Sequence, residues 1–165
     1  MLVKAYFNSY GIKSTISNCT NNYGPNQHPE KLIPKTILNA LLNRKIPIYG
    51  EGNQVRDWIF VDDHIKALEL ILEKGRVGWT YLVSAENEKN NLDVVLTILH
   101  MTGKSDELLS FVRDRPGHDV RYSLDPKRIK KELHWFPVTK LELGLERTVQ
   151  HYLLYKESYL TKLAQ

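Results

Sequence analysis

Cysteine is almost absent from this chain, in which Cys19 is the single residue of its kind. One thiol cannot form an internal disulfide, so a small disulfide-stapled secreted fold is excluded and a reducing compartment is favoured. The chain also lacks any apolar run near the ~20 residues that a membrane-spanning helix needs, and it opens on no signal-peptide pattern. We therefore expect a cytoplasmic protein without a membrane partner.

Clustered charge of one sign is missing too. Lysine and arginine together number 23 against 19 acidic residues, but they are scattered, and no basic run is interleaved with aromatic residues. The net charge of +4 permits an anionic partner, whereas a nucleic-acid partner is not expected. The six histidines and Cys19 show no metal-ligand spacing, and no nucleophile–base motif stands out. We thus predict no metal site and no catalytic residue in this chain.

The composition is otherwise that of an ordinary globular chain, with 42% hydrophobic and 25% charged residues. A chain of 165 residues is expected to form one domain and to bury roughly two-thirds of its unfolded surface. Apolar periodicity and turn residues predict helices and strands in turn along the chain. Helices are predicted at about 2–10, 30–42, 62–72, 92–101, 126–133 and 141–155, and strands at about 14–20, 46–49, 55–61, 79–83 and 111–113.

The most informative stretch runs over residues 21–25. It follows a predicted buried strand of small, β-branched and uncharged residues, and Gly24 and Pro25 end that strand, because proline fixes φ and has no N–H to continue a ladder. Ligands of open α/β sheets bind at the carboxyl ends of strands, where side-chain amides can bond a sugar hydroxyl or a carboxamide. Asn21 and Asn22 are therefore candidate ligand contacts. The alternative is an asparagine-rich turn that closes on its own backbone.

Residues near the ends of predicted elements give further candidates. Lys31 falls in the first turn of its predicted helix, where a cation opposes the helix dipole unless an anion binds there. Asp62 and Asp63 follow a strand and are expected to cap the next helix rather than to catalyse. Tyr49 can stack on a planar ring, although packing is the commoner fate of such a residue.

Two arginines, Arg56 and Arg115, lie at predicted strand–loop junctions far apart in the sequence. Guanidinium groups form bidentate bonds to phosphate, so the two together can hold a diphosphate, while each alone is more often a surface or salt-bridge arginine. His118 follows in the same loop. It can donate to the same phosphate or to a ribose hydroxyl, or it can be an ordinary solvated histidine.

Several segments occur in an order that resembles one enzyme family. They are NNYGP at 21–25, HPEKLIP at 28–34, PIYG at 47–50, RDW at 56–58, NEKNN at 87–91 and DRPGHD at 114–119. Together they resemble the carboxyl-terminal half of the dTDP-glucose 4,6-dehydratases, which are NAD-dependent extended short-chain dehydrogenases/reductases. The resemblance covers nearly the whole chain, to about residue 155. The NNYGP and RDW segments recur across sugar-nucleotide epimerases and decarboxylases, whereas EKLIP, NEKNN and DRPGHD are more particular to the dehydratases.

The resemblance implies an α/β fold made of the last strands of a Rossmann-type parallel sheet plus a small α/β substrate-binding domain. All of residues 1–165 would then be the carboxyl-terminal, substrate-binding portion of a dehydratase. In this family Asn21 would contact the sugar or its diphosphate, and Asn22 the nicotinamide region of NAD. The other matched positions would bind the dTDP-sugar. They are Lys31 and Leu32 along the diphosphate and nucleoside, Pro47, Ile48 and Tyr49 at the thymine, Arg56 and Arg115 on the phosphates, and Asn91 and His118 completing the nucleotide site.

The resemblance also implies what lies outside this chain. The family holds NAD on a glycine-rich turn and uses a Tyr-x-x-x-Lys pair with an acid/base carboxylate pair, all of which would lie before Met1. Tyr6 and Tyr10 cannot stand in, because neither is followed by lysine four residues later. We therefore expect a chain without the catalytic pair, which does not hold NAD tightly and is inactive alone. The family is homodimeric, and residues 1–13 resemble part of its dimerising helices.

In the complete enzymes of the family, NAD oxidises C4 of the sugar, water leaves across C5–C6, and the hydride returns at C6. Several interpretations of this chain stay open. It can be a truncated dehydratase of a dTDP-rhamnose-type pathway, or a fragment of a UDP-sugar epimerase or decarboxylase. It can also be a noncatalytic sugar-nucleotide-binding module, or half of a split enzyme whose partner is a separate amino-terminal half. A preference for thymidine over uridine nucleotides would separate the first two.

Overall fold

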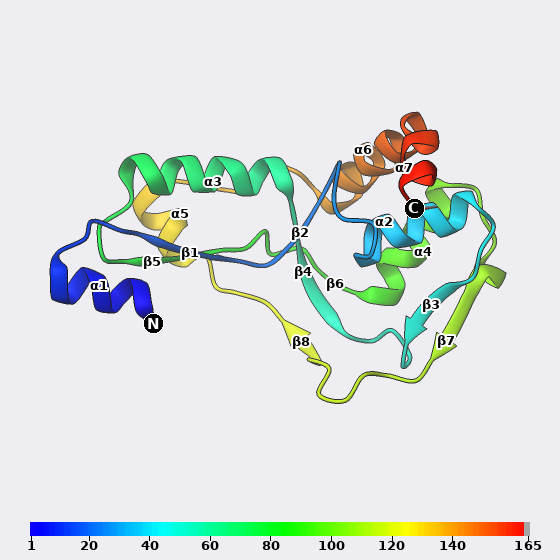
Figure 1. Ribbon diagram of the computed structural model, residues 1–165, viewed down its shortest axis with the longest axis horizontal. Coiled ribbons are helices and arrows are strands. Elements are labelled where there is room, and N and C mark those ends of the chain that lie inside the picture. The colour runs from blue at the N-terminus through cyan, green and yellow to red at the C-terminus, as the bar shows by residue number, and fades with distance from the viewer. Residues whose placement is uncertain (164–165) are drawn as a thin grey trace.

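Two groups of helices lie at opposite ends of an elongated molecule and are joined by strands that run between them (Figure 1). The computed structural model describes residues 1–163. The helices are α1 (Leu2–Tyr10), α2 (Leu32–Leu41), α3 (Val61–Lys74), α4 (Asn91–Met101), α5 (Lys127–Leu133), α6 (Leu141–Leu154) and α7 (Lys156–Leu163), with a 3₁₀ turn at Asp106–Leu108. The strands are β1 (Ile16–Cys19), β2 (Asn21–Tyr23), β3 (Ile46–Tyr49), β4 (Val55–Phe60), β5 (Thr80–Val83), β6 (Glu88–Asn90), β7 (Leu109–Val112) and β8 (Arg121–Tyr122).

Parallel strand pairs form the frame of both ends. Strand β1 pairs with β5 beside α3 and α5, whereas β3 pairs with β7 at the end that holds α2 and α4 (Figure 1). Between them, β4 pairs in parallel with β2 and β8 and antiparallel with β6. The predicted α/β class with parallel sheets is confirmed.

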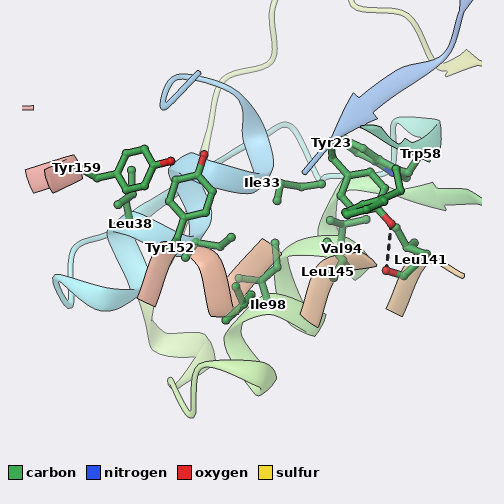
Figure 2. Close-up of a cluster of buried hydrophobic side chains, with 13 residues drawn as sticks. Tyr23, Ile33, Leu38, Trp58, Val94, Ile98, Leu141, Leu145, Tyr152 and Tyr159 are labelled. Carbon is green, nitrogen blue, oxygen red and sulfur yellow. Dashed lines mark hydrogen bonds between the residues drawn. The ribbon is translucent and has the colours of Figure 1, made fainter. Parts of the chain in front are cut away.

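Strand β4 separates two hydrophobic cores. Trp58 and Phe60 pack into the core shared by α2, α4 and α6, which Figure 2 shows with Trp58 beside Tyr23. Ile59 faces the other way and packs against α3, β5 and α5. Successive strand residues point to opposite faces, so a slip of one residue would exchange the two cores, and the register of β4 is fixed. That register places Asn21 directly opposite Trp58.

The asparagine pair lies in a strand and not in a turn. The sequence predicted one strand ending at Thr20, but the structure has β1 and then β2, with Thr20 between them. The chain changes partner at that point, since β1 pairs with β5 and β2 with β4. The prediction of a buried strand is also wrong, because β1 is half-buried and its Asn18 is exposed.

The prediction that Asp62 and Asp63 cap α3 is wrong as well. Phe60 occupies the N-cap position and makes no side-chain cap bond. Both acids lie within the first turn, where their negative charge interacts favourably with the helix dipole. The buried carboxylate of Asp63 instead accepts a hydrogen bond of 2.8 Å from the backbone N–H of Thr139. This bond ties α3 to the segment that leads into α6.

Helix α1 forms as predicted and ends at Gly11, whose φ of 66° is left-handed and whose N–H donates to the carbonyl of Phe7. None of its residues is buried. Strands β6 and β8 and helix α7 were not predicted. Within residues 1–163, no helix has the length and apolarity to cross a membrane.

Candidate functional site

A cleft opens where β2, β4, α2 and β3 meet the loop that follows β7. It has two adjoining compartments of about 450 and 350 Å³, within the size range of small-molecule sites, and Asn21, Arg56, Arg115 and His118 line both. The larger compartment is completed by Pro116, Gly117, Asp119 and Tyr122. The smaller one is completed by Glu30, Lys31, Leu32, Lys35, Pro47, Tyr49, Trp58 and Asn91. The fold thus gathers the predicted binding residues in one place, except for Asn22 and Ile48.

The two arginines of the cleft are held by other protein groups. Arg56 is 8% exposed, and its guanidinium donates to the carbonyls of Val55 at 2.7 Å and Asp119 at 2.9 Å. Arg115 lies with Nη2 2.8 Å from Nε2 of His118 and its guanidinium carbon 5.3 Å from the centre of the Tyr49 ring. A guanidinium has more N–H donors than these bonds use. Both arginines are therefore ordered and still able to bind an anion.

At the His118 end of the cleft, the carboxylate of Asp114 accepts hydrogen bonds from three neighbouring groups. One of its carboxylate oxygens accepts from Nε2 of Gln54 at 2.7 Å. The other accepts from Nδ1 of His118 at 2.7 Å and from the backbone N–H of Arg115 at 2.8 Å. Because a guanidinium can only donate, Nε2 of His118 accepts from Arg115 and Nδ1 carries the proton given to Asp114. Sequence reasoning assigned Asp114 no role, since these contacts depend on how the loop folds.

The bond from His118 has a consequence for titration. It holds the pKa of the Asp114 carboxyl below its ordinary value, with smaller contributions from the N–H of Arg115 and from Gln54. A pKa that is lower in the folded than in the unfolded chain stabilises the fold above the unfolded value of about 3.9. This contribution disappears as the pH falls through the folded-state pKa.

We expect His118→Ala to raise the pKa of Asp114 toward its ordinary value, because the strongest hydrogen bond to the carboxylate is removed. Titration of the Asp114 carboxyl carbon by NMR measures this shift. Gln54→Ala is the matched control and should raise the pKa less, since Gln54 contributes less. An unchanged titration of Asp114 in His118→Ala would contradict the assignment.

Two lysines add positive charge along α2. Lys31 is the N-cap residue and not a member of the first turn, because α2 begins at Leu32 rather than near residue 30. Lys35 lies one turn further and lines the same compartment, as its spacing of four residues from Lys31 allows. That spacing was a usable signal, although sequence reasoning missed Lys35. Glu30 also lines this compartment, but cations outnumber it there, and this excess favours an anionic ligand.

The asparagine pair divides between two faces of β2. Asn21 lines the cleft, whereas the side-chain nitrogen of Asn22 donates to the carbonyl of Thr20 at 3.2 Å and lies 3.1 Å from Sγ of Cys19. The alternative of an amide bonded to its own segment thus describes part of what Asn22 does. Its buried Oδ1 has no hydrogen-bond partner within residues 1–163.

This oxygen of Asn22, unpartnered within the described residues, is a polar atom that could contact NAD, as the resemblance implies for Asn22. The sequence Gly50-Glu51-Gly52 follows β3, but strand β4 comes next instead of a helix, so the context of a dinucleotide turn is absent there. A Cβ at Gly52 would lie 2.8 Å from Cβ of Leu92 and 2.9 Å from Cγ2 of Ile48, so this glycine serves close packing. No cluster of His, Cys, Asp or Glu able to hold a metal occurs in residues 1–163.

The residues expected at a base alternate along β3. Pro47 and Tyr49 line the cleft, whereas Ile48 between them is buried in the core with Val95 and Leu99. Asn91 begins α4, and its backbone N–H donates to the carbonyl of Gln54 at 3.1 Å. The alternation of strand side chains therefore turns the Ile48 side chain away from the cleft.

Tyr152 and Lys156 have the spacing of a Tyr-x-x-x-Lys pair, which Tyr6 and Tyr10 do not have. Helix α6 ends between them, at Leu154. The Tyr152 hydroxyl is buried and donates to the carbonyl of Gln27 at 2.6 Å. Burial and the neighbouring Tyr159 raise its pKa above the ordinary value, which is opposite to what a proton-accepting tyrosine needs. The structure thus shows this hydroxyl in a hydrogen bond between α6 and the loop that holds Gln27.

Comparison with known proteins agrees with this architecture. Residues 1–148 match the sequence profile of the family described as GDP-mannose 4,6 dehydratase. The chain belongs to this family. Within the GDP-mannose 4,6 dehydratase family, it is similar to the dTDP-glucose 4,6-dehydratase of Neisseria gonorrhoeae. The two are 47% identical over a match that covers 92% of this chain and 47% of that relative.

Solved structures of dehydratases have the same fold. The chain is similar to the dTDP-glucose 4,6-dehydratase of Bacillus anthracis in complex with NAD, with a TM-score of 0.91, 43% identity, and coverage of 95% of this chain and 50% of that one. It is also similar to the UDP-glucose 4-epimerase of Thermotoga maritima, solved with UDP-glucose. There the TM-score is 0.89 and the identity 26%, with coverage of 94% of this chain and 51% of that one.

These likenesses confirm the predicted resemblance to the dTDP-glucose 4,6-dehydratases and the predicted fold of an extended short-chain dehydrogenase/reductase. The chain spans about half the length of the relatives that it matches in this family. The cationic cleft lies within this chain. The unmatched part of each relative is about as long as the matched part.

Proposed function

We propose that this chain is the nucleotide-sugar-binding portion of a dTDP-glucose 4,6-dehydratase. The complete enzyme would convert dTDP-glucose to dTDP-4-keto-6-deoxyglucose with NAD, in dTDP-rhamnose-type biosynthesis. The observation that carries the proposal is the meeting of Arg56 and Arg115, from distant parts of the sequence, in one cleft. A diphosphate is a ligand group that needs two such forks, because each guanidinium can bond a different phosphate.

The lining residues suggest where each part of the ligand would lie in the cleft. The diphosphate would lie between Arg56 and Arg115, with Lys31 and Lys35 adding charge along one side. The thymine would contact Pro47 and Tyr49, whose ring is partly exposed on the cleft. The sugar would extend toward Asn21. Leu32, Asn91 and His118 would complete the nucleotide site.

Nucleotide titration tests this proposal. Thymidine diphosphate should bind the chain in about the high-micromolar to millimolar range, because a site assembled from one part of a larger enzyme is incompletely pre-organised. Uridine diphosphate should bind more weakly. The likeness to the UDP-glucose 4-epimerase makes a uridine-specific enzyme the second candidate, and a reversed preference in calorimetry would favour it.

We propose that the chemistry belongs to a part of the enzyme beyond these residues. In this proposal Asn22 would supply one contact to NAD, and residues 1–165 would not hold the cofactor tightly. The apolar face of α1 supports a partner, since Leu2 is 71% and Tyr10 74% exposed. That partner would be a separate amino-terminal half or, in the complete enzyme, a second subunit of a homodimer.

The purified 165-residue chain should form no 4-keto-6-deoxy sugar from dTDP-glucose and NAD. The physical reason is that the cleft holds binding groups. The tyrosine of the chain's one Tyr-x-x-x-Lys spacing, Tyr152, instead donates its hydroxyl proton to the carbonyl of Gln27. Product can be followed by mass spectrometry, with a complete dTDP-glucose 4,6-dehydratase as the positive control. Turnover by the purified chain, reduced by Arg115→Ala, would overturn the proposal that these residues only bind.

A further inference from the structure

The loop of residues 24–31 joins the strand of the asparagine pair to the helix of the lysine pair. It has little regular structure of its own, and Asn26 adopts a left-handed φ of 61°, which few residues other than glycine favour. The side-chain nitrogen of Gln27 donates to the carbonyl of Asn22 at 2.7 Å, which ties the loop to β2. The loop therefore connects two segments that line the cleft, β2 with Asn21 and the start of α2 with Lys31.

Two tyrosines from the far end of the chain reach this loop. The hydroxyl of Tyr152 on α6 donates to the carbonyl of Gln27 at 2.6 Å, and that of Tyr159 on α7 donates to Oδ1 of Asn26 at 3.0 Å. Their rings are stacked with centres 4.4 Å apart, and Figure 2 shows them side by side. Tyr152 is 0% and Tyr159 8% exposed, so water competes little for these bonds.

His151 fixes the direction of the Tyr159 hydroxyl. Nε2 of His151 lies 2.9 Å from that hydroxyl oxygen. A hydroxyl has a single proton, and Tyr159 gives it to Asn26, so the ring nitrogen of His151 must be the donor. The bond to Asn26 is therefore directed by a second group on the same helix pair.

We propose that Tyr152 and Tyr159 are positioning residues, which hold the loop of residues 24–31 in the conformation that presents Lys31 to a ligand in the cleft. The two bonds fix neighbouring loop residues from one rigid helix pair. They thereby reduce the conformational freedom that the loop would otherwise lose when a ligand binds. The effect on nucleotide affinity rests on the proposed function, whereas the effect on the loop does not.

Amide hydrogen exchange of the ligand-free chain tests the effect on the loop. Tyr159→Phe and Tyr152→Phe each keep the ring and remove the hydroxyl bond to the loop. Exchange in residues 24–31, where Gln27 and Lys31 donate backbone bonds, should become about 3- to 10-fold faster. Exchange in β5 should stay unchanged in Tyr159→Phe.

Tyr81→Phe is the matched control. It also removes the hydroxyl of a fully buried tyrosine, which donates to Glu132 at 2.9 Å in the group of helices and strands at the other end of the molecule. It should leave exchange in residues 24–31 unchanged. Equal acceleration of that loop in Tyr81→Phe and Tyr159→Phe would show general destabilisation and overturn the proposal. So would unchanged loop exchange in both Tyr152→Phe and Tyr159→Phe.

Titration with thymidine diphosphate separates this inference from the proposed function. Tyr159→Phe should weaken binding about 3- to 10-fold, in parallel with the faster loop exchange. Failure of the wild-type chain to bind would count against the proposed function, while the exchange result would still decide the role of the tyrosines in the loop. Faster loop exchange with unchanged affinity would overturn the link between this loop and the ligand.

Discussion

Arg56→Ala and Arg115→Ala should each weaken the binding of thymidine diphosphate by about ten- to a hundredfold. A charge-assisted hydrogen bond contributes about 1.5–3 kcal/mol, and 1.4 kcal/mol is a factor of about ten in affinity. The loss should be larger at Arg56, because it also holds the carbonyl of Asp119 and so the loop that carries Arg115. Calorimetry measures the affinities, and circular dichroism shows whether each variant is folded.

Lysine at either position should restore only part of the affinity. An ammonium keeps the charge but cannot present the planar fork, and at position 115 it also loses the contact with the ring of Tyr49. The two alanine losses should not add in the double variant, because both side chains bind one diphosphate. Arg44→Ala, which removes an exposed arginine that does not line the cleft, is the control and should leave affinity unchanged.

Unchanged affinity in both folded alanine variants would make Arg56 and Arg115 structural residues and would remove the diphosphate site from the proposal. Full additivity in the double variant would instead place the two arginines on separate ligand groups. The titration thus tests both the presence of a site and its geometry.

Local pattern predicted the elements whose ends are set by local chemistry. Helix α1 ends at Gly11 because glycine accepts the left-handed φ there, and β3 matches its predicted range of 46–49. The errors lie where distant segments decide. Asp63 accepts from Thr139 instead of capping its own helix, and the two-residue strand β8 exists only through its pairing with β4.

The candidate site was predictable to a similar degree. Motif order identified most of the residues that line the cleft, because those residues fall in a few short segments. Ile48 was assigned to the same surface as its neighbours, although alternation along β3 turns it into the core. The roles of Asp114 and Tyr152 depend on contacts with Gln54, His118 and Gln27, which no spacing in the sequence reveals.

Gly144→Ala should lower the free energy of unfolding by about 1–3 kcal/mol, although alanine is the better helix former by about 1 kcal/mol. Gly144 lies inside α6, where a Cβ would meet the hydroxyl oxygen of Tyr23 at 2.1 Å and Cδ2 of Phe60 at 3.0 Å. Tyr23 cannot easily retreat, because it is 1% exposed and its hydroxyl donates to the carbonyl of Leu141. Urea unfolding measures the change.

A double-mutant cycle with Tyr23→Phe identifies the cause. Phenylalanine removes the atom at 2.1 Å, so Gly144→Ala should cost less in the Tyr23→Phe background, with a coupling of about 1 kcal/mol or more. Tyr23 ends the strand that carries Asn21 and Asn22, so the same close approach fixes α6 against the strand of the cleft. A more stable Gly144→Ala variant would mean that helix propensity outweighs packing here and that α6 is not held against β2 by this contact.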